Sequence, residues 1–262
     1  MTAADRGAVL ARLKADPELS GLRRSLDFYY GDTRREASMD AFYGRFVRPG
    51  DLVFDVGAHV GDHIACFRRL GARVVALEPQ PSCMRVLEEL YGDEPEVSLV
   101  HAACGAEPGT LELHVNSDNP TVSTASSHFI EAAAGADGWH GQRWDGRIEV
   151  ASTTMDLLIE RYGVPAFAKI DVEGFEDRVL AGLSRSIPVL SFEFTTIERD
   201  LAARCLQRAT ELGFDGFTLS LGDERRFLVP DWVSAGELGE RLRALPHEAN
   251  SGDVYCRARE ER

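Results

Sequence analysis

Carboxylates and glycines stand together after the first short apolar run of the chain. The run LVFDV leads into DVGAHVG, in which Asp55 precedes Gly57 and Gly61. Glycine lets the backbone approach a ligand closely, and the start of the following helix offers unpaired N–H groups. The spacing is GxxxG rather than GxGxxG, and the Asp55 carboxylate would repel a pyrophosphate and attract an ammonium group. The loop therefore favours a ligand with a cationic end over a dinucleotide.

A second carboxylate ends the next apolar run. Glu78 closes the segment RVVALE, 17 residues after Gly61. A carboxylate at the tip of the second strand can accept both hydroxyls of a ribose. An ammonium group at the first loop, a ribose at the second strand and no phosphate together describe S-adenosylmethionine, which we predict as the cofactor. Taken singly, each carboxylate could instead be a helix cap or a solvated strand end.

A third group of charges lies in the segment AFAKIDVEG. Alternation along a strand places Lys169, Asp171 and Glu173 on one side. Ligands of open α/β sheets bind beyond the carboxyl ends of the strands, so these carboxylates should face the same crevice as Asp55 and Glu78. Methyl transfer to an alcohol requires alignment and a base, for which Asp171, Glu173 or a histidine could serve. The alternative is that the carboxylates cap the next helix and pair with Lys169.

The carboxyl ends of a parallel sheet would bring these side chains together, and the order of segments predicts such a sheet. From residue 51 onward, short apolar runs alternate with helix-like segments, which is typical of a parallel sheet covered on both faces. The runs cover residues 52–56, 73–78, 97–103, 166–172 and 188–194. Two later segments, 217–221 and 253–258, predict an antiparallel edge hairpin.

The remaining segments are predicted to surround this sheet. We expect a helical N-terminal cap or lid over residues 1–45 and one main domain over residues 46–262. An insert over residues 109–153 contains two strand-like segments of alternating polarity, separated by a long loop rich in Gly, Ser and Asn. Loops of this size inside a domain are usually functional or disordered. We therefore expect the insert to determine acceptor specificity.

Composition excludes several classes of protein. The chain has 262 residues, 29 basic and 43 acidic side chains and a net charge of −14, which argues against a nucleic-acid partner. The five cysteines form no CxxC pair, so neither a disulfide framework nor a zinc site is expected. Neither a secretory signal nor a bilayer-spanning run of ~18 apolar residues is present, so we predict a cytoplasmic protein without a membrane partner. The carboxylate spacing does not require a metal, and we predict none.

Beyond these patterns, the sequence resembles the FkbM family of class I S-adenosylmethionine-dependent methyltransferases. The resemblance covers residues 51–194 and is carried by DVGAHVG with VVALEPQP, HAACGAEPGTLELHV, TTMDLL, KIDVEG with FE, and LSFEF. It implies an α/β, Rossmann-like methyltransferase fold. His59 departs from the Asn that is common in the family, so its ring could contact the cofactor or the substrate. The implied cofactor site comprises Asp55, Gly57, Ala58, His59, Gly61, Glu78, Pro79, His101, Ala102, Ala103 and Asp171.

The resemblance implies methylation of a hydroxyl on a small-molecule specialised metabolite, such as a glycoside or a polyketide. The catalytic candidates are Asp171, Glu173 and His59. The candidates for acceptor binding are Lys169, Glu193, His128, Trp139 and Tyr30. Methyl transfer to nitrogen or to a peptide stays open within the class. A nicotinamide-dependent oxidoreductase and a non-catalytic cofactor-binding module are alternatives from other classes.

Overall fold

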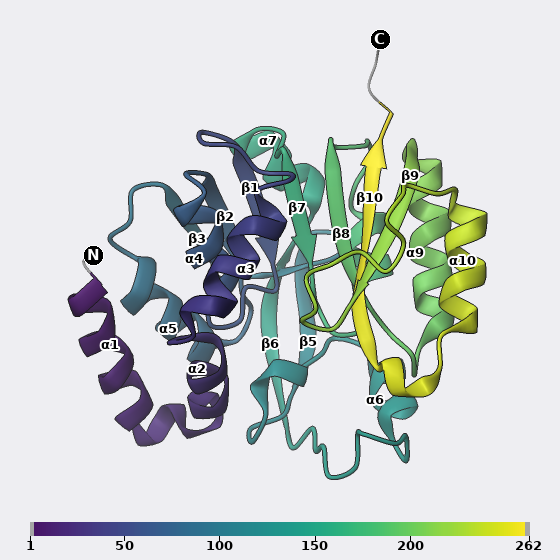
Figure 1. The fold of residues 1–262 in the computed structure, drawn as a ribbon. Helices are drawn as coiled ribbons and strands as arrows, with labels where there is room; N and C mark the ends of the chain where they lie inside the picture. Colours follow the sequence, from purple (N-terminus) through teal and green to yellow (C-terminus); the bar gives the residue numbers. More distant parts are fainter. Residues whose placement is uncertain (1–2, 260–262) are drawn as a thin grey trace.

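A seven-stranded sheet forms the centre of the molecule, which is described over residues 3–259 by a computed structural model (Figure 1). The strand order is β3-β2-β1-β7-β8-β10-β9, and all pairs except those of β10 are parallel. The strands are β1 (Leu52–Val56), β2 (Arg73–Leu77), β3 (Val97–Val100), β7 (Phe167–Ile170), β8 (Val189–Thr195), β9 (Phe214–Leu221) and β10 (Ser251–Ala258). The predicted α/β class with a mostly parallel sheet is therefore confirmed.

Helices cover both faces of the sheet, as the continuous apolar strands indicate. Because successive strand residues point to opposite faces, Val53 and Val74 join one core, whereas Phe54 and Val75 join the other. The first core is closed by α1 (Ala3–Ala15), α2 (Arg23–Tyr29), α3 (Thr33–Tyr43), α4 (Asp62–Arg69) and α5 (Pro81–Tyr91). The second is closed by α7 (Met155–Tyr162), α8 (Glu176–Ala181), α9 (Arg199–Glu211) and α10 (Ala235–Ala244).

The N-terminal segment is helical, and its apolar side chains are part of the first core. A short 3-10 helix, η1 (Pro17–Leu22), connects α1 to α2. The Tyr30 hydroxyl, at the end of α2, donates to the carbonyl of Val60 at 2.6 Å and lies 2.9 Å from the Tyr91 hydroxyl. This contact ties α2 to the glycine loop. The boundary of a separate cap at residue 45 stays a prediction.

The insert and a short strand that precedes it form a second, three-stranded sheet, which extends the molecule beyond the carboxyl ends of the main strands (Figure 1). Its order is β4-β6-β5, formed by β4 (Ala103–Cys104), β5 (Gly109–Val115) and β6 (Gly146–Thr153). The segment predicted as a loop also contains η2 (Pro120–Val122) and α6 (Ser127–Ala133). The Ser126 side chain caps α6 by accepting from the Phe129 N–H at 3.1 Å. Seven residues are too few to show a helical repeat in the sequence.

The predicted antiparallel pair at the sheet edge is present, but it is not a hairpin. Helix α10 and the short helix η3 (His247–Ala249) lie between β9 and β10. Strand β10 lies inside the sheet and pairs antiparallel with both β8 and β9. The buried run Val254, Tyr255 and Cys256 explains this position, because an interior strand is covered on both faces.

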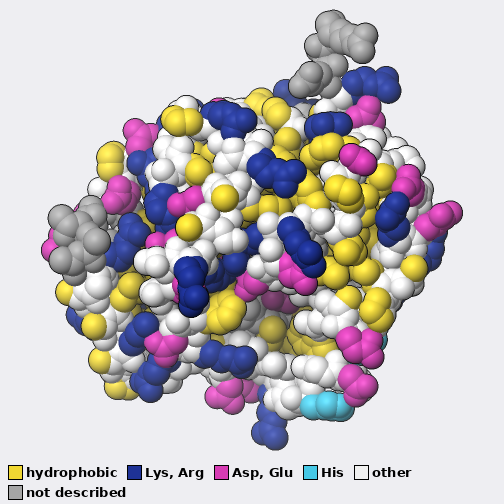
Figure 2. Space-filling view, in the orientation of Figure 1, with side chains coloured by type: hydrophobic (Ala, Val, Ile, Leu, Met, Phe, Trp, Pro, Cys, Tyr) yellow, Lys and Arg dark blue, Asp and Glu magenta, His cyan; other side chains and the backbone are white. Residues whose placement is uncertain are grey.

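The cysteines and the charged surface residues are the next features of the structure. All five cysteines are buried and free. Basic and acidic side chains are interspersed on the face seen in Figure 2. Within residues 3–259, no helix has both the length and the apolar character needed to cross a bilayer.

The Tyr30 hydroxyl is expected to stabilise the fold. Tyr30→Phe should lower the free energy of unfolding by about 1 kcal/mol, because a buried hydrogen bond to the Val60 carbonyl is lost. Urea denaturation measures this change, with Tyr162→Phe on α7 as the control variant. An unchanged unfolding midpoint for Tyr30→Phe would show that this hydrogen bond does not stabilise the fold.

Candidate active site at the carboxyl ends of the strands

A cavity of about 360 Å³ lies where β1, β2, β7 and β8 end and where the insert begins. In the space-filling view it is seen as a hollow below the centre of the molecule, with acidic side chains in it (Figure 2). Its lining includes many of the residues predicted from the sequence: Gly57, Ala58, His59, Glu78, Pro79, Ala102, Ala103, Trp139, Lys169, Asp171, Glu173 and Glu193. The carboxylates of three strands therefore meet at one edge, as the topology requires.

The glycine loop is pressed against the end of β7. Gly57 has φ +89°, and a Cβ atom there would lie 1.8 Å from the carbonyl oxygen of Asp171. Only glycine combines this backbone conformation with this approach. The N–H groups of Gly57 and Ala58 donate to the Leu77 carbonyl at 3.0 and 2.9 Å, which holds the loop against β2 as well.

Glu78 is fixed at the end of β2 by two backbone groups. Its Oε1 accepts from the Gln80 N–H at 2.8 Å, and its Oε2 accepts from the His59 N–H at 2.9 Å. The side chain is buried, which raises the pKa of Glu78 to about 7. Each oxygen keeps a free lone pair, so the carboxylate can accept two further hydrogen bonds from a ligand with paired hydroxyls.

His59 links the glycine loop to the insert. Its Nε2 lies 3.2 Å from the Thr121 hydroxyl, and its Nδ1 lies 3.5 Å from the Cys83 sulfur. Burial lowers the pKa of His59 to about 4, so the ring is neutral near pH 7. Both ring nitrogens have partners, and a base of this pKa is weak. The geometry therefore favours a positioning role over the predicted catalytic one.

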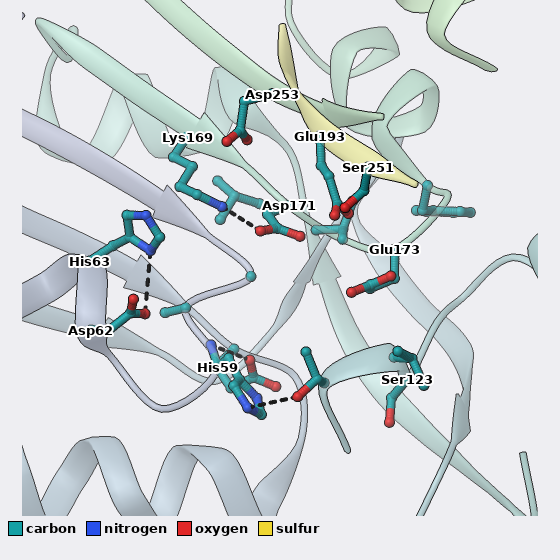
Figure 3. A pocket seen from close by; sticks show the side chains of 18 of the residues that line it. His59, Asp62, His63, Ser123, Lys169, Asp171, Glu173, Glu193, Ser251 and Asp253 are labelled. Carbon is teal, nitrogen blue, oxygen red and sulfur yellow. Dashed lines mark hydrogen bonds and ion pairs between the residues drawn. The ribbon is translucent and has the colours of Figure 1, made fainter. Parts of the chain in front are cut away.

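Asp171, Glu173 and Glu193 form a carboxylate cluster on the other side of the cavity. Their carboxylate oxygens lie within 4.8 Å of one another, and the side chains converge (Figure 3). Lys169 Nζ donates to Asp171 Oδ2. Strand β7 ends at Ile170, so a turn, not strand alternation, brings Glu173 to the cluster. A cation could share these oxygens, but the expectation that no metal is bound stays a prediction.

The three carboxyl groups of this cluster differ in acidity. Burial alone would raise the pKa of Asp171, but the ion pair with Lys169 outweighs it and lowers that pKa. Burial, together with the nearby negative charge of Asp171, holds the pKa values of Glu173 and Glu193 well above the usual range. The cluster therefore combines one carboxylate that stays charged with two carboxyl groups that hold a proton more tightly than usual.

The backbone of Glu173 is strained. Its φ is +54°, a left-handed conformation that costs free energy in a residue other than glycine. Gly174 follows with φ +87°, and the Thr124 hydroxyl of the insert donates to the Glu173 carbonyl at 2.6 Å. The turn is thus maintained by tertiary contacts that aim the Glu173 side chain into the cavity.

Two residues predicted for the cofactor lie behind the glycine loop. Asp55 is 1% exposed and is not part of the lining, and its Oδ2 has no hydrogen-bond partner among the described residues. Gly61 faces Tyr91 and Leu87, because a Cβ there would lie 2.6 and 2.8 Å from their side chains. The predicted contact of the Asp55 carboxylate with a ligand ammonium stays a prediction, which the burial of this side chain does not favour.

Three other predicted residues also lie off the lining. His101 is exposed and its ring donates to the Pro79 carbonyl at 3.2 Å. The His128 side chain is 68% exposed, with Nε2 3.6 Å from Glu198 Oε1. Tyr30 is committed to the Val60 carbonyl. Sequence position alone placed these residues near the site, and the local backbone directs their side chains elsewhere.

Several residues that line the cavity were not among the site residues predicted from the sequence. Arg35 and Tyr29 come from the N-terminal helices, and Asp62 and His63 come from the start of α4. Asp253 reaches the same edge because β10 is antiparallel, so the beginning of that strand lies there. The charged pair Asp62–His63 directly after Gly61 was a visible signal, whereas nothing local marks Asp253.

Comparison with known proteins places the chain in a family. A family model described as "Methyltransferase FkbM domain" matches residues 55–215. The chain belongs to the FkbM methyltransferase family. The chain therefore contains a methyltransferase domain of the FkbM type, which argues against the nicotinamide-dependent oxidoreductase alternative.

The individual proteins that the chain resembles have low sequence identity to it. The chain is 28% identical over 149 residues to the hexuronic acid methyltransferase AglP of Haloferax volcanii, a match that spans 56% of each protein. The precorrin-6y C5,15-methyltransferase of Geobacter metallireducens is similar with a TM-score of 0.45 and 10% identity, over 88% of this chain and 90% of the other. An O-methyltransferase of Bacillus cereus, solved in complex with SAH, is similar with a TM-score of 0.45 and 9% identity, over 98% and 92% of the two chains.

Glu176, buried beneath the Glu173 turn, makes stability depend on pH. Its Oε1 accepts from the Val172 N–H at 3.0 Å, and burial raises the pKa of Glu176 from 4.5 to about 8. The folded protein therefore binds this proton more tightly than the unfolded chain, so the stability gained is complete below pH 4.5 and is lost as the pH rises through 8.

Glu176→Gln should flatten this dependence, because the amide keeps an acceptor for Val172 without a titrating proton. Between pH 5 and 8, the free energy of unfolding should fall less steeply than in the wild type, by up to about 1.4 kcal/mol per pH unit. Urea denaturation at several pH values measures the slopes, with the exposed Glu160→Gln as the control. Equal slopes for wild type and Glu176→Gln would contradict the prediction.

Proposed function

We propose that this enzyme transfers a methyl group to a hydroxyl of a small, polar molecule such as a glycoside or another specialised metabolite. The observation that carries the proposal is the arrangement of one cavity, with the anchored Glu78 on one side and the cluster of Asp171, Glu173 and Glu193 on the other. The first side suits a nucleoside, and the second suits an acceptor that must lose a proton.

The glycine loop and the end of β2 fit the cofactor. Gly57 carries no side chain where the loop approaches Asp171, and Glu78 offers two oriented oxygens. Gly57, Ala58 and Glu78 would hold the ribose side, and Pro79, Ala102 and Ala103 would contact the adenine. When bound, S-adenosylmethionine supplies an electrophilic methyl group on a sulfonium.

Glu173 is the best candidate for the base. An alcohol has a high pKa, so its oxygen becomes a competent nucleophile only if a positioned group accepts the proton. In the proposed step, the acceptor O–H proton passes to the Glu173 carboxylate as the new O–C bond forms and the C–S bond breaks. Glu193 would hold a neighbouring polar group of the acceptor, and Lys169 would keep Asp171 charged and in place.

The name of the relative from Haloferax volcanii supports a sugar-like acceptor, because that protein acts on a hexuronic acid. Trp139, from the insert, adds an aromatic surface to a lining that is otherwise rich in polar groups. The net charge of −14 supports a small molecule over a nucleic acid, and a cytoplasmic location without a membrane partner is part of the proposal.

Transfer to an amine is the second candidate. The carboxylate cluster would attract a protonated amine, and the same groups could remove its proton before transfer. Incubation with labelled S-adenosylmethionine and a panel of glycosides and amines, followed by mass spectrometry and NMR, identifies the methylated atom. Methylation of amines alone would overturn the proposed O-transfer.

Glu78 should control cofactor affinity. Isothermal titration calorimetry should show binding of S-adenosylhomocysteine and none of NADH. Glu78→Gln should weaken binding by about 10-fold or more, because the amide N–H₂ faces a backbone N–H and loses an acceptor. The exposed Glu88→Gln on α5 is the matched control. Unchanged affinity in Glu78→Gln would remove Glu78 from the cofactor site.

Glu173 should control turnover. Glu173→Gln should lower kcat by about 10²–10⁴-fold and leave the affinity for S-adenosylhomocysteine within threefold. The pH profile of kcat should lose its acidic limb, since the group proposed to take the acceptor proton then no longer titrates. Glu131→Gln, on the exposed face of α6, is the control. A variant with an intact pH profile would assign the base to another residue.

A further inference from the structure

The amino-acid end of the cofactor lacks a partner in the site as predicted from the sequence. S-adenosylmethionine carries an ammonium and a carboxylate side by side on its methionine portion. Asp55, expected to receive the ammonium, is buried behind the glycine loop and does not line the cavity. The carboxylate cluster at β7 and β8 would repel the cofactor carboxylate. Both charges of the amino-acid group therefore need other partners.

Arg35 and Asp62 form an ion pair at the end of the glycine loop. Arg35 Nη1 donates to Asp62 Oδ2 at 3.0 Å, and the two side chains are 10% and 9% exposed. Both residues line the cavity, and Asp62 is the first residue of α4, directly after Gly61. The pair thus presents a positive and a negative group next to each other, at the end of the glycine loop where α4 begins.

The Arg35 guanidinium is held in a fixed position. It lies 4.8 Å from the centre of the Tyr29 ring and 5.4 Å from that of Phe28. Asp32 caps the start of α3 by accepting from the backbone N–H groups of Arg34 and Arg35 at 2.9 and 3.4 Å. A guanidinium oriented in this way loses little freedom when it binds a carboxylate.

The guanidinium also has capacity for a further carboxylate. Its Nε is buried and has no hydrogen-bond partner among the described residues. Its Nη2 donates at 3.2 Å to Asp223, a half-exposed residue that Arg225 also binds, at 2.6 Å. Asp223 shows that this edge of Arg35 accepts a carboxylate from the cavity side, and its second partner allows it to be displaced.

The other cations of the lining are less suited. Apart from His59 and His63, the other basic residues in the described lining are Lys169 and Arg225. Lys169 is almost completely buried and donates to Asp171. Arg225 lies after β9 and donates to Asp223 Oδ1 at 2.6 Å, the same oxygen that Arg35 binds. Arg35 is therefore the cation best placed to reach a ligand beside the glycine loop.

We propose that Arg35 binds the carboxylate and Asp62 the ammonium of the methionine portion of the cofactor. The inference rests on the proposed use of this cavity and extends it to two residues, one of which belongs to the N-terminal helices. Those helices would then complete the cofactor site. Binding would exchange the Asp223 carboxylate on Arg35 for that of the ligand.

The test compares three ligands by calorimetry. S-adenosylhomocysteine carries both charges, its decarboxylated analogue keeps only the amine, and 5′-methylthioadenosine carries neither. The wild type should bind S-adenosylhomocysteine at least about 10-fold more tightly than the decarboxylated analogue. If the wild type binds none of the three nucleosides, the proposed function itself fails.

Arg35→Met should weaken S-adenosylhomocysteine binding by about 10–100-fold and change the affinity for the decarboxylated analogue by less than threefold. Arg34→Met is the matched control, because that side chain is 95% exposed on the same helix, and it should change neither affinity. An unchanged affinity for 5′-methylthioadenosine shows that the adenosine site is still folded. Equal weakening of all three ligands, or of none, would overturn the assignment of Arg35.

Two further variants separate ligand binding from a structural role. Asp223→Asn should tighten S-adenosylhomocysteine binding a few-fold, because it removes the competing carboxylate, and should not affect the decarboxylated analogue. Asp62→Asn should reduce the preference for the decarboxylated analogue over 5′-methylthioadenosine. A purely structural Arg35–Asp62 pair predicts neither change, so wild-type preferences in both variants would refute the proposal.

Discussion

The contact between Gly57 and the carbonyl of Asp171 is the constraint on which the site depends. With the position of a missing Cβ only 1.8 Å from that oxygen, no side chain can be accommodated at residue 57. The Asp171 N–H donates to the Val56 carbonyl at 2.9 Å, and the loop N–H groups bind the Leu77 carbonyl, so three strand ends are joined at this point. Glu78 and the carboxylate cluster are thereby brought into one cavity.

The charges around the cavity show why so many acidic groups can coexist. Some are neutralised by cations, as Asp171 is by Lys169 and Asp62 is by Arg35. Others, such as Glu78, have their pKa values raised by burial, so they carry less than a full charge near neutral pH. A cationic ligand that enters the cavity therefore meets a negative potential that is spread over several acidic residues of the lining.

The sequence was sufficient for the parallel sheet and for most of the carboxylates that meet at its edge. Periodicity located the parallel strands, and the glycine spacing with Glu78 predicted S-adenosylmethionine as the cofactor. Local patterns were insufficient where position depends on distant segments. Asp55 looked like a ligand because it precedes the glycines, yet the turn of the loop buries it. Arg35 and Asp253 reach the cavity through helix packing and an antiparallel strand, and neither has a local signature.

Strand β10 has a consequence for how the molecule assembles. It fills the space between β8 and β9, and both of its edges are paired. Until it enters, the facing edges of β8 and β9 carry unsatisfied backbone groups, which are templates for pairing with another chain. Because β10 pairs with strands far away in sequence, this closure belongs to the slow, non-local class of folding events. Recombinant fragments that stop before residue 251 would leave both edges open and are poor candidates for soluble expression.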